Sequence, residues 1–92
     1  MFMIRDWLHD ESQGKFLTLE DAVTELQKLA QLPWDTPPNR APCMNWKNCG
    51  RNYEIVEYND SMSPWKEIQT IPALEVRATG ATWDGNFQKN LE

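Results

Sequence analysis

The sequence predicts an α+β fold: one amphipathic helix packed on a three- to four-stranded, mainly antiparallel sheet, with a long proline-rich loop. Three observations support this prediction. Residues 18–31 repeat apolar side chains at helical spacing, residues 52–58 form a short run rich in β-formers, and residues 73–84 have the pattern of a β-hairpin. The sequence contains no internal repeat and no low-complexity segment.

The helix expected over residues 18–31 has the clearest signal. Thr18 is a good N-cap residue, and Asp21, three positions later, completes an acidic variant of the capping box. Glu20 and Asp21 place negative charge at the positive end of the helix dipole, and Lys28 lies near the other end. The stripe expected to pack on the sheet consists of Leu19, Ala22, Val23, Leu26, Leu29 and Ala30.

The segments on either side of this helix have weaker signals. Residues 1–8 alternate like a strand but also fit a helical stripe, and we expect a short strand because residues 9–14 read as a turn. Four prolines lie within residues 32–42. Because proline fixes φ and lacks an N–H group, we expect residues 33–51 to form an irregular but ordered loop.

The chain after this loop is expected to be mostly strand. Residues 52–58 predict one strand, with a turn at residues 59–61. Ser63 followed by Pro64 is typical of the start of a helix, because proline is well tolerated at the first helical position. We therefore expect residues 64–69 to form a single helical turn.

A β-hairpin is expected next, with strands at residues 73–78 and 81–84. A two-residue loop, Thr79-Gly80, would set Val76 opposite Trp83. The inner face of this hairpin would then consist of Leu74, Val76, Ala78, Ala81 and Trp83.

The size and charge of the chain restrict its function. We expect residues 1–90 to form a single domain and residues 91–92 to be the remnant of an expression vector. The net charge of −5 argues against binding to nucleic acids or anionic membranes. Arg5 and Asp6 interrupt the first apolar run, and no run approaches the roughly 20 residues of a membrane span, so a cytoplasmic protein is expected.

Residues that could catalyse a reaction are few and scattered. His9, the single histidine of the sequence, lies in a predicted turn, whereas nucleophilic catalysis needs a base beside the nucleophile. Glu54, Glu57 and Asp60 could act as paired acids and bases, but they alternate along or follow a solvated strand, where solubility explains them better. We therefore expect no enzyme, no catalytic residue and no cofactor.

Cys43 and Cys49 are separated by five residues. A zinc site needs four ligands, and only His9 and carboxylates could complete one, so we expect no metal site. A redox pair more usually has two intervening residues. A disulfide would stabilise the loop by roughly 2–2.5 kcal/mol, but a reducing cytosol opposes it. Two reduced cysteines are expected, and a thiol-dependent redox or sensor role through this pair is the alternative.

Positive charge gathers in the proline-rich loop. Residues 36–53 contain no carboxylate, while Arg40, Lys47 and Arg51 lie there together with Trp46. Such a loop on an acidic protein is suited to recognise a carboxylate or another anionic group, which arginine can bind in bidentate geometry. Alternatively, these cations pair with the protein's own acidic groups and hold the loop in place.

A resemblance rests on the pattern APCxxWxxCGRxYEIxEY at residues 41–58, followed by SPWKEI at residues 63–68 and by PALEVxAxG at residues 72–80. In these motifs the chain resembles a family of short uncharacterised cyanobacterial proteins whose function is unknown. The similarity covers about residues 5–83. It implies a cytoplasmic bacterial protein, and it implies no activity and no catalytic residue.

These observations predict a small non-enzymatic protein-interaction or ligand-binding module that uses its cationic, aromatic loop, residues 40–51. Its partner would be a protein or a small anionic ligand. There are two alternatives: a thiol-dependent redox or sensor protein acting through Cys43 and Cys49, and an acidic inhibitor of a basic partner protein. The residues expected to bind the partner are Arg40, Trp46, Lys47 and Arg51.

Overall fold

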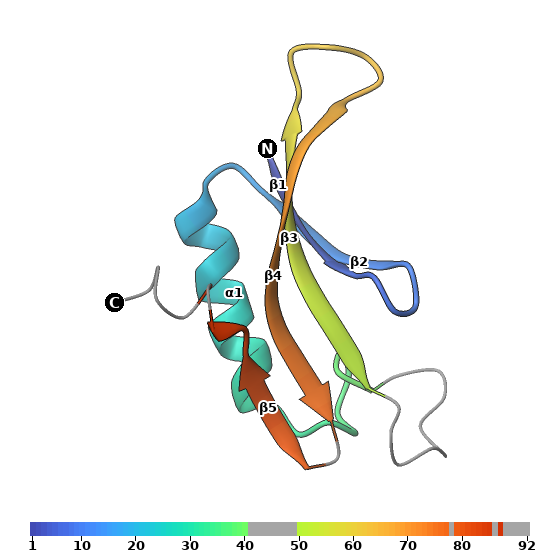
Figure 1. Cartoon of the computed structure of the whole chain (residues 1–92), viewed down its shortest axis with the longest axis vertical. Helices are drawn as coiled ribbons and strands as arrows, with labels where there is room; N and C mark the ends of the chain where they lie inside the picture. The colour runs from blue at the N-terminus through green and yellow to red at the C-terminus, as the bar shows by residue number, and fades with distance from the viewer. Residues whose placement is uncertain (41–49, 78, 86, 88–92) are drawn as a thin grey trace.

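The computed structural model describes residues 1–40, 50–77, 79–85 and 87. In this part of the chain one helix packs on a five-stranded antiparallel sheet, which confirms the α+β class but exceeds the three to four strands expected. The strand order is β2-β1-β3-β4-β5. Figure 1 shows α1 along one face of the sheet and the long strands β3 and β4 beside it.

Helix α1 (Leu19–Gln31) begins where the sequence predicts. The Thr18 hydroxyl accepts a hydrogen bond from the N–H of Asp21 at 3.1 Å, which satisfies one of the unpaired donors of the first turn. The inner side of the predicted stripe packs on the sheet. Its fully buried members are Ala22, Leu26 and Leu29.

The N-terminal residues form a hairpin rather than a strand and a turn. Strand β1 (Phe2–Asp6) was predicted, but β2 (Glu11–Phe16), which pairs with it, was not. A turn was expected over residues 9–14. The actual turn ends at Asp10, whose φ is 53°, and residues 11–14 belong to β2 instead. Strand β2 lies at the edge of the sheet and is mostly polar, so no apolar alternation marks it in the sequence.

Strands β3 (Arg51–Asn59) and β4 (Lys66–Arg77) form a long antiparallel pair. The predicted strand over residues 52–58 is confirmed, whereas the helical turn expected over residues 64–69 is wrong. Glu57 pairs with Gln69 there, and this extended ladder satisfies more backbone groups than one isolated helical turn could. Extra residues in β4 shift the register at two points, at Ile68 and at Ala73.

The predicted second hairpin is confirmed, but its register is wrong. Leu74, not Val76, lies opposite Trp83 in β5 (Gly80–Trp83). Gly80, whose φ of 130° favours glycine, already pairs with Arg77, so β5 begins one residue earlier than expected. The pairing is shifted from Val76 to Leu74, an even number of residues, so the same side chains of β4 face inward. Leu74 and Val76 therefore remain buried on the inner face, as predicted.

The core lies between α1 and the sheet. Its residues come from the helix, from the central strands and from Phe87, whose ring stacks on Trp83 at 5.7 Å between ring centroids. None of the described helices is long and apolar enough to cross a membrane. The buried members of the core are Ile4, Ala22, Leu26, Leu29, Tyr53, Ile55, Ala73, Leu74, Val76 and Phe87.

Candidate functional site

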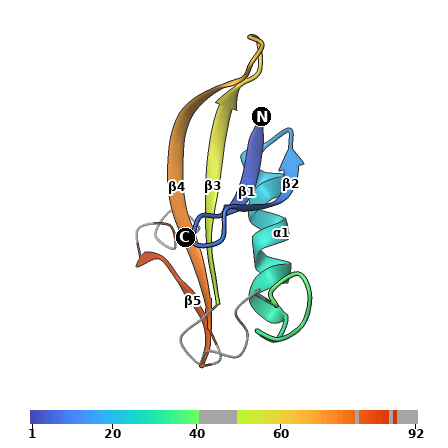
Figure 2. The same ribbon diagram turned by 90° about the vertical axis from the view of Figure 1, so that its right-hand side faces the viewer.

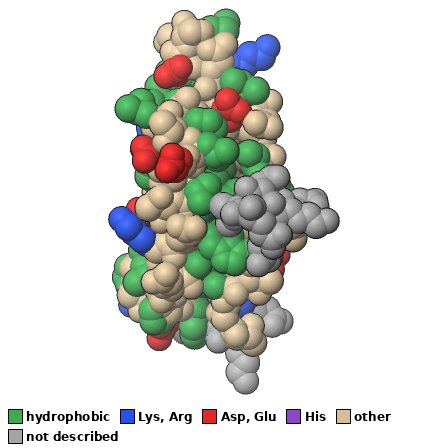
Figure 3. Space-filling model, turned by 90° about the vertical axis from the view of Figure 1, so that its left-hand side faces the viewer, with side chains coloured by type: hydrophobic (Ala, Val, Ile, Leu, Met, Phe, Trp, Pro, Cys, Tyr) green, Lys and Arg blue, Asp and Glu red, His purple; other side chains and the backbone are tan. Residues whose placement is uncertain are grey.

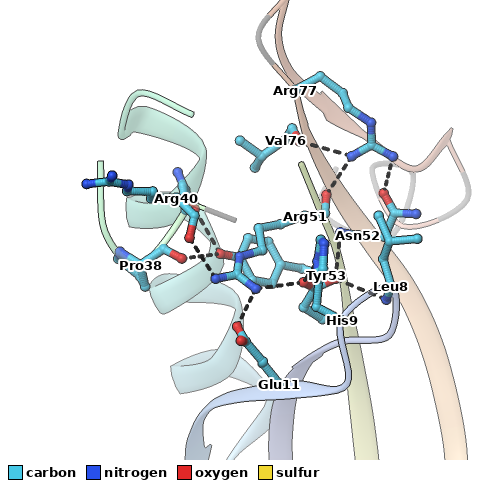
Figure 4. A network of polar contacts seen from close by, with 12 residues as sticks. Leu8, His9, Glu11, Pro38, Arg40, Arg51, Asn52, Tyr53, Val76 and Arg77 are labelled. Atoms are coloured by element: carbon cyan, nitrogen blue, oxygen red, sulfur yellow. Dashed lines mark hydrogen bonds and ion pairs between the residues drawn. The ribbon is translucent and has the colours of Figure 1, made fainter. Parts of the chain in front are cut away.

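A buried ion pair joins β1 to the start of β3. The Arg51 guanidinium donates through Nη1 to the Oδ2 of Asp6 at 2.9 Å, and these residues are 5% and 0% exposed. The other carboxylate oxygen accepts the backbone N–H groups of Asn52 at 3.0 Å and of Leu8 at 3.1 Å. Both oxygens of Asp6 are thus bonded within the protein. Figure 4 shows the polar network around Arg51, with His9, Glu11 and Asn52 beside it.

Three further segments meet this ion pair. The His9 imidazole Nδ1 lies 2.7 Å from the Oδ2 of Asp6, and the Glu11 carboxylate pairs with the Nη1 of Arg51. Arg51 also donates through Nη2 to the backbone carbonyl of Arg40 at 2.8 Å. Arg51 of β3 therefore contacts β1, the start of β2 and the loop that follows α1, and the turn after β1 joins the cluster through Asp6.

The charges of this cluster stabilise one another. Burial alone would raise the pKa of Asp6, but hydrogen bonds from Arg51, from the N–H of Asn52 and from His9 outweigh it and hold that pKa below its ordinary value of 3.8. Burial likewise opposes ionisation of Arg51, yet its bonds to Asp6 and Glu11 raise the pKa of Arg51. Asp6 and Arg51 are therefore both charged at neutral pH.

A second buried cluster anchors the loop at the end of α1. The Tyr53 hydroxyl donates to the Oδ1 of Asn39 at 2.9 Å. The Asn39 amide in turn donates to the carbonyls of Leu29 at 2.8 Å and of Leu32 at 3.2 Å, at the end of α1, where carbonyls lack the partners that the next helical turn would supply. Burial raises the pKa of Tyr53, so its hydroxyl keeps its proton and remains a donor.

The sequence-predicted site residues fall into two groups. Arg51 is buried and its described bonds go to the protein's own groups, while Arg40 is exposed and offers its backbone carbonyl to Arg51. The structure brings these two residues together through that bond. Residues 41–49 of the expected proline-rich loop lie outside the described residues, and with them four of the predicted site residues: Cys43, Trp46, Lys47 and Cys49.

An arm projects from the opposite end of the sheet. We define the arm as residues 58–72. Residues 58–68 lie beyond the last β1 pair, Phe2 with Glu57, whereas residues 69–72 of β4 lie opposite Glu54–Glu57 of β3 and beyond the end of β5. Figure 2 shows the turn of the arm extending past α1, β1 and β5. Three of its large apolar side chains are exposed: Met62 at 54%, Trp65 at 38% and Ile68 at 57%.

Aromatic and cationic groups surround the base of the arm. The Trp65 ring lies 6.2 Å from the Tyr58 ring, centroid to centroid, and the Lys15 ammonium lies 5.1 Å from the centre of the Trp65 ring. The second distance is within the range of a cation–π interaction. In the space-filling view of the α1 side, hydrophobic side chains reach the surface up to the arm at the top, among scattered charged ones (Figure 3).

One edge of the arm has no described strand beside it. β5 pairs with β4 only from Leu74 to Arg77, and the Ala73 carbonyl accepts the N–H of Asp84 at 2.8 Å. We call residues 66–72 of β4 the open edge. Such an edge presents unpaired backbone groups to the surroundings.

The direction of these groups follows from the alternation of an antiparallel ladder. Tyr58 exchanges backbone bonds with Met1, so the even-numbered residues of β3 direct their N–H and C=O toward β1. Val56 belongs to this set and lies opposite Thr70 of β4. Because Val56 faces away from β4, Thr70 exchanges no bonds with it, and the N–H and C=O of Thr70 point to the open edge.

Sequence reasoning missed the arm because Ser63 and Pro64 suggested a helix start. A signal for strand was nonetheless present, since Ile68, Thr70 and Ile71 are β-branched residues, which favour strands. The exposure of the arm could not be predicted. It depends on where β1 and β5 end relative to β4.

Comparison with known proteins adds no relative to this description: no protein-family model matches the chain, and neither does any curated protein or any solved structure.

Proposed function

We propose that this protein is a non-enzymatic protein-interaction module whose contact surface is the arm. The observation that carries the proposal is the open edge, where Thr70 directs its N–H and C=O away from β3 and Ile68 is exposed. Met62 and Trp65 are exposed elsewhere on the arm. An extended segment of a partner can add to such an edge as a further strand, with backbone hydrogen bonds giving affinity and side chains giving specificity.

The exposed side chains of the arm are of the kinds that stabilise interfaces. Tryptophan is enriched among the residues that contribute most to binding energy, and methionine and aromatic residues are enriched in interface cores. Met62, Trp65 and Ile68 are distributed over the turn and the first half of β4, on a part of the protein that no described helix covers. Burial of this apolar surface by a partner would be favourable.

The arm is better suited to this role than the buried end of β3. Arg51 is 5% exposed and already pairs with Asp6 and Glu11, so an external anion would have to break those bonds to reach it. Removing Arg51 from its partners would leave Asp6 as a buried charge without its counterion, which is costly. Arg51 therefore supports the fold, and the proposed contact surface lies at the other end of the same strand.

Photo-crosslinking tests the proposal. A photoreactive phenylalanine analogue placed at Ile68 should crosslink to a protein in an extract of the source cells, whether that protein is a second copy or a different chain. The matched control carries the same analogue at Gln27, an exposed position on α1. A yield at position 68 no higher than at position 27, in variants with equal thermal midpoints, would contradict the arm as a contact surface.

A further inference from the structure

We infer that the open edge is occupied by a second copy of this chain, with β4 pairing antiparallel to β4 about a two-fold axis at Thr70. This inference rests on the proposed function, because it identifies the partner of the same surface. The result is one continuous sheet made from both copies. The contact is isologous, which means that each copy uses the same residues.

The backbone of Thr70 determines where the axis lies. In an antiparallel pair, residues directly opposite each other either exchange two hydrogen bonds or none. Thr70 directs both its N–H and its C=O outward, so two copies centred there can exchange a complete pair of bonds. Toward β5, the next residue of β4 whose backbone groups point to the open edge is Pro72, and proline has no N–H that could be left unpaired. Thr70 is therefore the natural centre of the contact.

The side chains of the open edge fit this arrangement. A centre at Thr70 sets Ile68 of one copy near Pro72 of the other, so apolar groups meet. The two threonines lie opposite each other, and threonine pairs are favourable across strands. The exposed Ile68, which packs poorly in a single copy, thereby loses contact with water.

Charge selects the antiparallel orientation. The open edge contains one cation and one carboxylate, Lys66 and Glu67, and both lie at the same end of it. With the axis at Thr70 only residues 68–72 of each copy pair, because the chain at the end of β5 already bonds to Ala73 and pairs with Leu74. Antiparallel pairing therefore leaves these charges at opposite ends, just outside the paired residues, whereas parallel pairing would set each beside its own copy. The open edge is neutral although the chain carries a net charge of −5, so repulsion between the copies is weak where they meet.

The entropy of ordering favours a second copy over a disordered peptide. β4 is already extended and is fixed by its pairing with β3. Association of two preformed strands avoids the ordering cost that a disordered segment must overcome when it binds. The contact is nevertheless short, so we expect a dimer that forms and dissociates with concentration.

Sedimentation equilibrium on the purified full chain, in reducing buffer and from low micromolar to several hundred micromolar, tests the inference. The average mass should rise from one chain toward two as the concentration increases. Thr70→Pro removes the outward N–H but no β3–β4 bond, and it should remain monomeric with an unchanged thermal midpoint. Thr70→Ala keeps that N–H and is the matched control, which should still dimerise and should lose only the contribution of the threonine pair.

A wild-type chain that stays monomeric throughout would overturn the inference, and so would a folded Thr70→Pro variant that dimerises normally. If Thr70→Pro does not fold, Ile68→Lys replaces it, with Ile68→Val as its control, and undiminished dimerisation of Ile68→Lys would overturn the inference. The two proposals can fail separately. A monomeric wild type whose position 68 still crosslinks to a different protein rejects the second copy but supports the interaction module, while the absence of both results rejects both.

Discussion

Asp6 and Arg51 are 45 residues apart in the sequence, and their side chains meet at 2.9 Å in the interior. This contact ties the N-terminal hairpin to the central strand and holds the carbonyl of Arg40 as well. Arg51 was one of the four residues expected to bind a partner. In the structure it neutralises a fully buried carboxylate.

The first prediction concerns this ion pair. Arg51→Ala leaves Asp6 buried without its counterion, so we expect the free energy of unfolding to fall by about 3–5 kcal/mol. Urea denaturation measures the change. Lys28→Ala is the control, because Lys28 is mostly exposed and its substitution should change stability by less than about 0.5 kcal/mol. A loss at Arg51 as small as that of the control would contradict the structural role.

The second prediction concerns acid stability. The pKa of Asp6 is lower in the folded protein than its ordinary value of 3.8, so the unfolded chain binds the proton more readily. The contribution of Asp6 is therefore complete above this value and is lost as the pH falls below it toward the folded pKa. We expect the stability difference between wild type and Asp6→Asn to be largest at neutral pH and to shrink on acidification, as measured by denaturation at a series of pH values. A difference independent of pH would rule this out.

The third prediction concerns the helix face. Leu26 is 0% exposed against the sheet, so Leu26→Ala should cost about 2–5 kcal/mol through lost transfer energy and a cavity. Leu17→Ala removes the same atoms from a position that is 78% exposed, and it should cost less than about 0.5 kcal/mol. Thermal and urea unfolding of the two variants compare them directly. Equal losses would show that the packing face of α1 has been misassigned.

The fourth prediction concerns Gly50, which precedes Arg51. A Cβ at this position would lie 1.9 Å from the carbonyl oxygen of Val76, so a side chain forces the neighbouring strands apart. We expect Gly50→Ala to cost about 1–3 kcal/mol, as overpacking does elsewhere. Gly85→Ala is the control, because in the described part of the chain no atom other than those of its sequence neighbours lies within 4 Å of the added Cβ. Calorimetric midpoints that shift equally for both variants would be inconsistent with this close approach.

The parts of the fold that could be predicted are those with local signals. Thr18 and the stripe that includes Leu26 define α1 within a few residues, and the alternating residues 52–58 define β3. Strand β2 could not be predicted because it is a polar edge whose strand character comes from pairing with β1. The first half of β4 was not predicted, because Pro64 gave a local signal for a helix. Pairing with β3 overrides that signal.

The site could be predicted only in part, for a related reason. The composition of the loop drew attention to Arg51, but its partner Asp6 lies in a different strand, and no local pattern connects the two. That Arg51 pairs with the protein's own acidic groups was one of two interpretations open from the sequence. The open edge at Thr70 depends on where β5 stops pairing with β4, and strand ends of this kind are decided by tertiary contacts.

Amide hydrogen exchange at Thr70 tests most directly whether the open edge pairs with a second copy of the chain. The account predicts that this amide exchanges rapidly in dilute solution and slows as the protein concentration increases, because a second strand then accepts its hydrogen bond. The amide of Ile71, which pairs with Ile55 inside the sheet, should exchange slowly at every concentration. A Thr70 amide whose exchange rate is the same at both ends of the concentration range, whether fast or slow, would contradict the central claim.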